Sequence, residues 1–514
     1  DTRRELAQPM AEKLGQAAAT GTFWDLERAG CVLVVNSNVT EDHNVAAVPL
    51  KRGKRQNGVK ILVIDPREVE LTRYADVWLR PRPGTEGVVV AGLLRAVLDA
   101  GQEDKAFLAE RVDGLDQLRA SLGAYMPEHV ARVSGVAADD LVKAARMFGT
   151  SKPGAILYAL DNVPSDQRAA IASVLVDLAL VTGNVGKPSG GLFPLRPGGN
   201  VQGAQDVGFV PDAAGVGADG LSGAVQAGRI KALQVVGDSP FFDDGVLHIL
   251  SNLEFLVVHD TFLSGVAQQA DVVLPLSPFT EADGTMTSLE RRVQRQRKAT
   301  GPKGGSQPAW SAMGQVAQRM GAQGFGYPDA SRVFAELVQA APMYAGVTEQ
   351  MVEKPGGAQW PVSAQGGTTV LHQTAFAAGK ARLSPVSVAA APAWTNTEFP
   401  LLLTPGRVLA QNHREVSVVR SGPLNQVQRD EHIEVHSGDA SAAGIAEGDS
   451  VEVVAPGLRL RGRAALSGRL RGVISVTMLF GQLATSVQGS ETPDPMMRVP
   501  ALDILPARLQ KTTS

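Results

Sequence analysis

Cysteine is almost absent from this sequence. Among the 514 residues there is a single cysteine, Cys31, which opens the apolar run CVLVVNSN. A buried structural thiol is the expected state of a cysteine in such a run, in preference to a nucleophile or a metal ligand. One cysteine cannot complete a four-cysteine site, so a cysteine-bound iron–sulfur cluster and a structural zinc site are both excluded from this stretch of chain.

A strong net charge and long apolar runs are lacking as well. Lysine and arginine number 49 against 52 aspartates and glutamates, so the formal net charge is -3 and no overall field favours nucleic acid or anionic lipid. No apolar run reaches the roughly 18 residues that a membrane-spanning helix needs. The opening DTRRELAQPMAEKLG has neither an initiator methionine nor a signal-peptide pattern, and we expect a soluble chain that is a piece of a longer polypeptide.

What the first 300 residues do contain is a regular alternation of strand-like and helix-like segments. Short β-branched runs begin at residues 31, 60, 154, 232, 255 and 271. Longer helical patterns lie between them, for example from Gly87 and from Arg168. This alternation predicts α/β structure with parallel sheets, in which the loops at the carboxyl ends of the strands meet at one edge. The loops concerned read NSNVTE, DPRE, GDSP and DTF.

The second half of the chain has a different texture. A mixed region from about residue 301 ends in the linker-like AAAPAWTNTEFP, and short strands with turn signals follow, such as PLLLTPGRV and DSVEVVAPG. These strands predict a small β-barrel or sandwich. We therefore expect an α/β domain over 1–200, a second over 201–300, a connecting region over 301–395 and a β-domain over 396–514.

The strand-to-loop segments carry side chains that suit a nucleotide. No GxGxxG follows a predicted strand and opens a helix, and no GxxxxGK[ST] is present, so ordinary dinucleotide and ATP motifs are unsupported. Asp65 could accept a hydrogen bond from a ribose or a guanine, and Arg67 and Arg82 could pair with phosphate oxygens. Each segment taken alone is more typical of a simple turn, whereas several together favour binding.

For two other segments an ordinary structural role is a more common interpretation than a functional one. His432 and His436 in DEHIEVH share one face of a predicted strand, where a solvated face is the more common state than a metal site. The Arg-rich stretch TEADGTMTSLERRVQRQRKA, from Thr280, predicts an exposed basic turn and the start of a helix.

Several long segments, in this order, resemble the molybdopterin oxidoreductase family over almost the whole chain. They read NSNVTEDH, ILVIDPREVELTRYADVWLRPRPGT, LALVTGNVGKPSGGLFPLRPGGNVQGAQDVG, VVGDSPFFDD and DTFLSGVAQQADVVLPLSPFTEADGTMTSLERRVQ. The C-terminal PLLLTPGRV, DASAAGIAEGDSVEVV and ETPDPMMRVPAL are similar to the final barrel of that family. The resemblance is strongest to formate dehydrogenase α-subunits and to the large molybdopterin-like subunit of respiratory complex I, an NADH-quinone oxidoreductase.

The resemblance implies Rossmann-like parallel-sheet domains followed by a C-terminal double-psi β-barrel. In active members these segments enclose two molybdopterin guanine dinucleotides around one metal. The residues implied in cofactor binding are Asn36, Asn38, Asp65, Arg67, Arg82 and Gly84 for one dinucleotide, and Gly237, Asp238, Pro240, Asp260, Gly406 and Arg407 for the other. Arg196 matches an arginine beside the metal of formate dehydrogenases, where it would be a catalytic residue that meets a carboxylate.

The sequence also departs from the family pattern. The cysteine or selenocysteine that ligates the metal, and the histidine after it, fall on Ala7 and Gln8, and an alanine cannot ligate molybdenum. The segment PLRGQNNVQGACDMG of formate dehydrogenases becomes PLRPGGNVQGAQDVG, around Arg196. Such changes are typical of an inherited cofactor loop without its chemistry, so we expect no cofactor and no metal in this chain, at most a vestigial dinucleotide site.

These departures favour the complex I subunit over a formate dehydrogenase. The chain would then have a structural and assembly role in the peripheral arm, in the cytoplasm at the inner face of the cell membrane, without being catalytic itself. Iron–sulfur clusters would lie upstream or in partners, namely an NADH-oxidising flavoprotein and iron–sulfur subunits. The alternatives are the catalytic α-subunit of a molybdenum- or tungsten-dependent formate dehydrogenase, and a scaffold that binds a pterin or guanine nucleotide without turnover.

Overall fold

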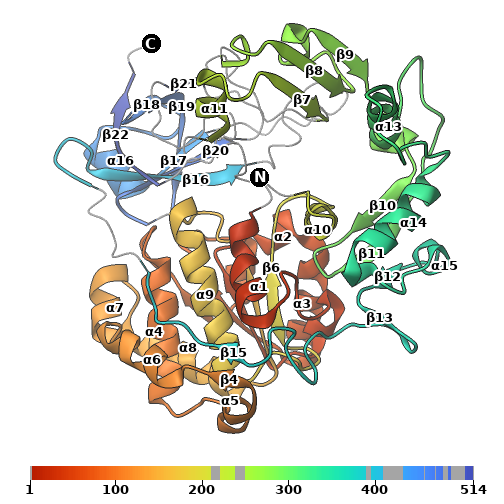
Figure 1. Cartoon of the computed structure of the whole chain (residues 1–514). Coiled ribbons are helices and arrows are strands. Elements are labelled where there is room, and N and C mark those ends of the chain that lie inside the picture. The colour runs from red at the N-terminus through yellow and green to blue at the C-terminus, as the bar shows by residue number, and fades with distance from the viewer. Residues whose placement is uncertain are drawn as a thin grey trace.

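The computed structural model of the protein describes residues 3–209, 220–237, 249–388, 395–408, 432–456, 458–468, 470–478, 484–487 and 504–512. Four parts follow one another along these residues (Figure 1). They are an α/β part around a five-stranded sheet, a smaller parallel sheet, a connecting region and a β-barrel.

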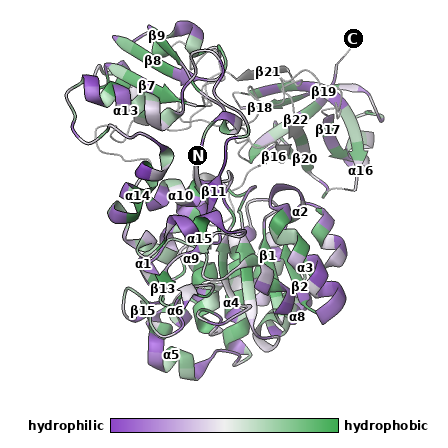
Figure 2. Cartoon of the chain, turned by 90° about the vertical axis from the view of Figure 1, so that its right-hand side faces the viewer, coloured by the Kyte–Doolittle hydropathy of each residue, from purple (hydrophilic) through white to green (hydrophobic). Residues whose placement is uncertain are grey.

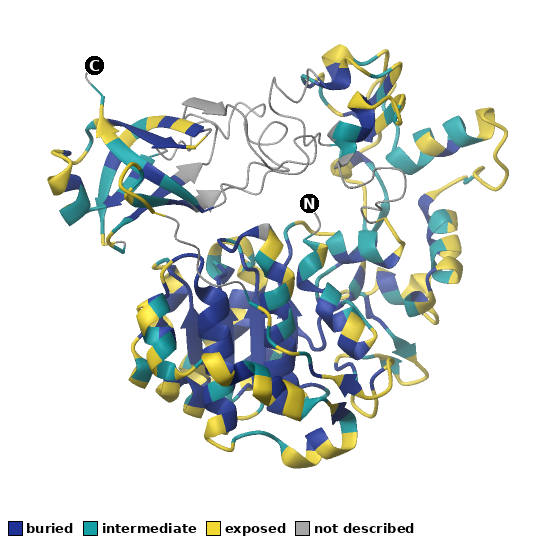
Figure 3. Ribbon diagram, turned by 60° about the vertical axis from the view of Figure 1, so that its left-hand side comes forward, coloured by how far each residue is buried: buried dark blue, intermediate teal, exposed yellow. Residues whose placement is uncertain are grey.

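The first sheet is parallel and has the strand order β3-β2-β1-β5-β6. Its strands are β1 (Cys31–Val35), β2 (Lys60–Ile64), β3 (Val77–Leu79), β5 (Gly154–Tyr158) and β6 (Gly191–Pro194). The strands run through a buried core (Figure 3), as expected for β-branched runs that are covered on both faces. The predicted strands at 31, 60 and 154 are therefore present.

Helices cover both faces of this sheet. Alternate strand residues such as Leu33 pack with one apolar cluster, and the others, such as Val34, pack with a second. The first cluster includes α1 (Gln8–Leu14), α4 (Glu86–Asp99), α8 (Ala138–Thr150) and α9 (Ser165–Val181); the second includes η2 (Phe23–Arg28) and α3 (Asn44–Asn57). Further elements of this part are η1 (Arg4–Leu6), α2 (Val39–Asp42), α5 (Lys105–Arg111), β4 (Val112–Asp113), α6 (Leu115–Ser121) and α7 (Pro127–Ser134).

The second sheet is also parallel. Its order is β7-β8-β9, with β7 (Ala232–Val236), β8 (Phe255–Asp260) and β9 (Val272–Pro275), which are the strands predicted from residues 232, 255 and 271. In the described residues, α10 (Val201–Asp206) and α11 (Gly220–Gln226) precede this sheet.

The connecting region contains helices, small antiparallel sheets and a last short strand that pairs in parallel with β4. These are β10 (Gly284–Thr287), β11 (Arg292–Gln296), α13 (Ala309–Arg319), α14 (Ala330–Ala340), α15 (Glu349–Glu353), β12 (Ala358–Gln359), β13 (Val362–Ser363), β14 (Gly366–Gly367) and β15 (Ala381–Arg382). The expectation of an exposed basic turn and a helix start after Thr280 is wrong, because this stretch forms the β10–β11 hairpin.

Arg291, in the turn of that hairpin, is wholly buried. Its guanidinium donates to the carbonyl oxygens of Ala19, Trp360, Thr368 and Thr369. A buried cation is tolerated when its N–H groups find such acceptors, which composition alone does not reveal.

The C-terminal part is the predicted β-barrel. The order β17-β20-β16-β22-β18-β19-β21 closes on itself because β17 also pairs with β19. Its elements are β16 (Leu401–Val408), β17 (His432–His436), α16 (Ser437–Ala442), β18 (Ser450–Ala455), β19 (Leu458–Ser467), β20 (Val473–Met478), β21 (Ala484–Val487) and β22 (Leu505–Lys511).

The barrel and the second sheet both lie beyond the carboxyl ends of the first sheet (Figures 1 and 3). The N-terminal end of the described chain lies between them, and Arg80, just after β3, donates to the carbonyl of Gly468 in the barrel. The hydropathy colouring of Figure 2 places apolar residues in the layers of the first sheet and polar ones on the outer helix faces. In the described residues, no helix combines the length and apolar character required to span a membrane.

Candidate functional site

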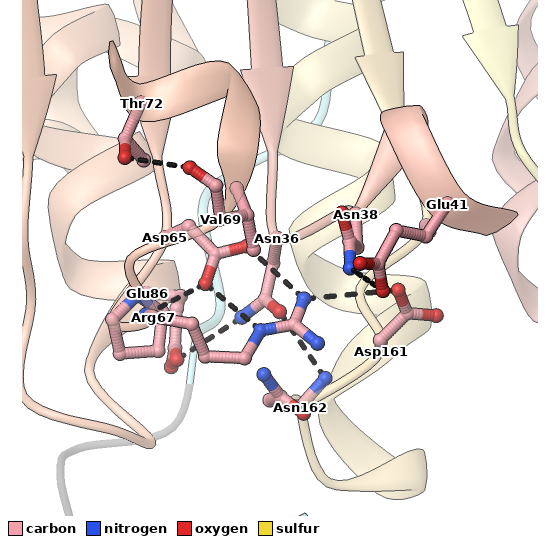
Figure 4. A network of polar contacts seen from close by, with 12 residues as sticks. Asn36, Asn38, Glu41, Asp65, Arg67, Val69, Thr72, Glu86, Asp161 and Asn162 are labelled. Atoms are coloured by element: carbon pink, nitrogen blue, oxygen red, sulfur yellow. Dashed lines mark hydrogen bonds and ion pairs between the residues drawn. The ribbon is translucent and has the colours of Figure 1, made fainter. Parts of the chain in front are cut away.

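The predicted residues Asn36 and Asp65 lie at adjacent carboxyl ends, directly after β1 and β2 (Figure 4). Asn36 has a φ of 46°, a left-handed conformation that asparagine tolerates better than most residues. Its amide donates to Glu86 at 3.1 Å, and its side-chain oxygen accepts from the backbone N–H of Asn162 at 3.2 Å. Asn36 thereby ties together the loops after β1 and β5 and the start of α4.

Asp65 and Arg67 form a close pair. The Arg67 Nε and Nη2 groups donate to the two carboxylate oxygens of Asp65, both at 3.1 Å. A second carboxylate, that of Asp161 in the loop after β5, lies 3.8 Å from Arg67. Asp65 is fully buried, so this bidentate pair compensates its charge and fixes the loop where a ligand would bind.

Glu86, at the start of α4, is a buried carboxyl that sequence reasoning missed. Burial raises its pKa to about 8, and the charge of Asp65 adds to this rise. Its Oε1 accepts from Asn36, whereas Oε2 has no hydrogen-bond partner within the described chain. The hydroxyl of Ser37 is likewise buried and lacks a partner there. The run RPGTEGVVV offered one signal, an acidic residue in the first turn of a helix that follows a strand.

The other residues predicted beside the first sheet have separate contacts or turn positions. Asn38 donates to Glu41 at 2.8 Å. Arg82 donates to the carbonyls of Arg132 and Val133 at the end of α7, so it is not joined to the Asp65 pair. Gly84, with a φ of 82°, provides the turn that leads into α4.

The residues predicted at the second sheet are only partly described. Gly237 follows β7 with a φ of 80°, and its N–H donates to the carbonyl of His259. Asp260 ends β8 and accepts from the backbone of Phe262 and the hydroxyl of Ser264, which shapes the following loop. Asp238 and Pro240 lie outside the described residues, and for Gly406 and Arg407 only the backbone of β16 is described.

His432 and His436 lie on β17, as predicted. The ring of His436 accepts from the backbone of Gly438, and His432 lies 3.7 Å from Glu434. Among the described residues, no group of three or more histidine, cysteine, aspartate or glutamate side chains is arranged to hold a metal ion.

Arg196 follows β6 and is 1% exposed. Its Nη2 donates to Gln202 at 2.6 Å and its Nη1 to Gln205, while its Nε has no partner in the described structure. Both direct partners are neutral amides from α10. The carboxylate of Asp206 lies one hydrogen bond further away, beyond Gln202. Burial lowers the pKa of Arg196 to about 10, so the group is a cation at neutral pH.

Ala7 and Gln8, the positions implied for the metal ligand and its histidine, form the start of α1. Ala7 is fully buried, and its carbonyl accepts from the backbone of Met10 and Ala11. Leu6, next to it, accepts from the hydroxyl of Tyr158 at 2.9 Å, and Tyr158 in turn acts electrostatically on Arg196. The turn that contains Ala7 therefore lies near the surroundings of Arg196, but the side chain of Ala7 is a methyl group, which cannot ligate a metal.

Cys31 cannot take the place of the missing ligand. It opens β1, four residues before the carboxyl end of that strand, which puts it about 13 Å along the strand from the site. The thiol is buried, as predicted, and burial raises its pKa to about 12. The sole cysteine is thus an inert core residue at the amino end of its strand, away from the candidate site.

Comparison with known proteins matches two family models to this chain. The molybdopterin oxidoreductase model matches residues 5–319, and the Molydopterin dinucleotide binding domain model matches residues 401–504. The chain belongs to the molybdopterin oxidoreductase family. The two matches indicate a molybdopterin dinucleotide site, so the expectation that the chain has no cofactor is not supported.

Relatives of this family member carry formate dehydrogenase names. The F420-dependent formate dehydrogenase 1 subunit alpha of Methanococcus maripaludis is 30% identical over 541 residues, covering 98% of this chain and 79% of that protein. The F420-dependent formate dehydrogenase 2 subunit alpha of the same organism is 31% identical, with the same coverage. These relatives favour the formate dehydrogenase alternative over the complex I subunit, and their names indicate that such subunits have partner subunits.

A solved structure shares the fold. Acetylene hydratase from Pelobacter acetylenicus superposes with a TM-score of 0.72 at 18% identity, covering 92% of this chain and 73% of that one. This likeness confirms the α/β architecture with a C-terminal barrel and concerns the fold alone.

Proposed function

We propose that this chain is the α-subunit-type component of a formate-dehydrogenase-like oxidoreductase. In this proposal the strand ends of the two sheets and the barrel bind a molybdopterin dinucleotide, and Arg196 receives a small carboxylate. The proposal is supported by the formate dehydrogenase names of the relatives and by the chemistry of Arg196.

The observation that carries it is the buried environment of Arg196. A buried guanidinium whose direct partners are neutral amides carries a positive charge that no direct contact compensates, and burial makes such a charge costly unless an anion approaches it. The unpartnered Nε provides an N–H donor for that anion. Formate carries a single negative charge, which is the charge that this arrangement accepts.

The residues at the end of the first sheet fit a dinucleotide. Two buried polar atoms there, Ser37 Oγ and Glu86 Oε2, have no partner in the described chain, and a bound ligand with polar edges would satisfy them. Asn36, Asp65 and Arg67 hold the surrounding loops in place. When bound, the cofactor would supply the two-electron redox chemistry that none of these side chains provides.

The residue implied as the metal ligand does not fit. The methyl group of Ala7 offers no donor, and Cys31 lies at the amino end of its strand, away from the candidate site. We therefore derive no reaction step through a metal. The contributions assigned to this chain are to hold the dinucleotide and to bind and orient the carboxylate.

Formate binding by the protein purified with its natural partners tests this function. Titration with 13C-formate, followed by NMR line broadening, is expected to show saturable binding that is lost in Arg196→Met, a change that keeps the bulk and removes the charge. Chloride and acetate serve as competitors of the same charge. The proposal fails if formate does not bind, or if Arg196→Met binds it equally well. Co-purification with NADH-oxidising subunits and without formate binding would support the role in complex I instead.

A further inference from the structure

Arg196 is one end of a continuous hydrogen-bonded chain that reaches into the connecting region. From Arg196 the chain passes through Gln202 to Asp206, whose carboxylate also accepts from Trp360 and Tyr344. Tyr344 in turn shares a hydrogen bond with Thr287 of β10. Gln202 and Asp206 belong to α10, whereas Tyr344 and Trp360 lie 138 and 154 residues after Asp206. The tertiary fold therefore brings this series of hydrogen bonds together.

Trp360 fixes the direction of one hydrogen bond at Asp206. The indole Nε1 of Trp360 can only donate, and it donates to Asp206 Oδ2 at 2.9 Å. Oδ2 of Asp206 is therefore an acceptor. Its other oxygen, Oδ1, accepts from Gln202 Nε2 at 2.7 Å. Since the amino group of Gln202 donates to Asp206 and, at 3.4 Å, to the carbonyl of Ala17, its own carbonyl oxygen faces Arg196.

The orientation of the Gln205 amide follows in the same way from its own hydrogen-bond partners. Its Nε2 donates to the carbonyl of Ala17 at 2.9 Å, so its Oε1 faces Arg196 Nη1. In the segment PLRPGGNVQGAQDVG this glutamine stands where the formate dehydrogenase pattern has cysteine. Two amide oxygens thus fix the two Nη groups, and the Nε–H remains unpartnered in the described structure.

We propose that Asp206 is a positioning residue for Arg196: by fixing the amide orientation of Gln202, it holds the guanidinium so that its Nε–H edge receives one oxygen of a small monocarboxylate. Asp206 acts on Arg196 through the side chain of Gln202 and does not neutralise the guanidinium by direct contact. This inference rests on the proposed function for the identity of the anion, whereas the orientation of Arg196 is independent of it.

Asp206→Asn tests the inference because it preserves shape and reverses one hydrogen bond. The oxygen of the introduced amide would accept from Trp360 and Tyr344, and its amino group would face the amino group of Gln202. Gln202 is then expected to turn over, which places its amino group against Arg196 Nη2. We expect 13C-formate affinity to fall about tenfold or more, since a hydrogen bond to a charged group is lost and replaced by repulsion.

A second readout does not depend on any anion. In protein labelled with 15N-arginine, the Nε–H of Arg196 is expected to give a resolved, slowly exchanging signal, assigned by its loss in Arg196→Met. Asp206→Asn should shift this signal and accelerate its exchange. If the signal and its exchange are unchanged in Asp206→Asn, the positioning role is refuted. If the signal responds but wild-type protein binds no formate, the proposed function fails and the positioning role stands.

Two further variants separate orientation from charge and from general destabilisation. In Asp206→Asn combined with Gln202→Glu, the new carboxylate at position 202 accepts from both the introduced amide and Arg196. We expect the Nε–H signal to return while formate affinity stays low, because Arg196 is then neutralised by direct contact. Asp104→Asn makes the same chemical change at the start of α5, where Asp104 caps the helix, and is expected to leave both readouts within about twofold of wild type. A purely structural role for Asp206 predicts instead that the double variant restores neither readout.

Discussion

The buried ion pair between α1 and α9 offers a quantitative test of how the N-terminal segment is attached to the sheet. Lys13 Nζ lies 2.5 Å from Asp177 Oδ1, and the two side chains are 5% and 1% exposed. Burial raises the pKa of Asp177 to about 6, although the charge of Lys13 opposes the rise. Lys13→Met keeps the aliphatic bulk and removes that opposing charge.

The expected loss of stability depends on pH. In the wild type the folded-state pKa of Asp177 exceeds its ordinary value of 3.8, so the free energy of unfolding falls as pH rises from 3.8 to about 6, and this group adds no further change above that. Without Lys13, Asp177 stays protonated in the folded state to higher pH, and the fall continues at about 1.4 kcal/mol per pH unit. Relative to wild type, Lys13→Met should therefore lose about 3 kcal/mol at pH 8 and little below pH 5.5.

Urea unfolding at pH 5.5, 7 and 8, followed by circular dichroism, measures this difference. The control is Lys13→Met combined with Asp177→Leu, which removes the carboxyl and should be within about 1 kcal/mol of wild type with no added pH dependence. A loss that is equal at pH 5.5 and pH 8, or a double variant as unstable as Lys13→Met, would refute the reasoning.

Three further changes test other parts of the account. Glu86→Gln should stabilise the protein relative to wild type, and the difference should grow from pH 4.5 to pH 8. The reason is that the folded state holds the Glu86 proton up to about pH 8, whereas the unfolded chain loses it near pH 4.5. Thermal melts should show no gain in the free energy of unfolding at pH 4.5 and a gain of at least about 2 kcal/mol at pH 8. Cys31 should not react with a thiol reagent at pH 8 in the native protein and should react fully in urea, and rapid native labelling would contradict its burial. Gly191→Ala should lower the melting temperature, since its φ is 108° and a Cβ would lie 2.1 Å from the hydroxyl oxygen of Thr20; an unchanged melting temperature would contradict this contact.

The sequence predicted those parts of the fold that depend on local pattern. Apolar runs such as CVLVV and KILVI are long enough to mark fully buried strands, and Asp65 and Arg67 directly follow one of them, so their meeting at the sheet edge could be foreseen. The barrel was predictable because its strands are short and separated by turn residues. The division of the chain at residues 200, 300 and 395, and the attachment to the inner face of the membrane, stay predictions.

The rest of the candidate site depends on contacts between distant segments. Asp206, Tyr344 and Trp360 meet only because the connecting region folds back onto α10, and no local pattern marks them. Arg291 was expected on an exposed turn because arginine is usually solvated, yet four carbonyl groups from two other segments accept its hydrogen bonds. Glu86 has the local features of an ordinary first-turn residue, and only burial beside Asp65 gives it an unusual protonation state.

The measurement that tests the central claim most directly is the cofactor content of the protein purified from its native host. Metal analysis for molybdenum and tungsten, together with fluorescence of the oxidised pterin and release of the nucleotide, should be made on wild type and on Glu86→Arg. Glu86→Arg places a bulky cation at the proposed dinucleotide site. The account predicts pterin and guanine nucleotide at a fixed ratio to wild-type protein and a marked loss of both in the variant. Wild-type protein that contains neither pterin nor nucleotide, while intact and bound to its partners, would contradict it.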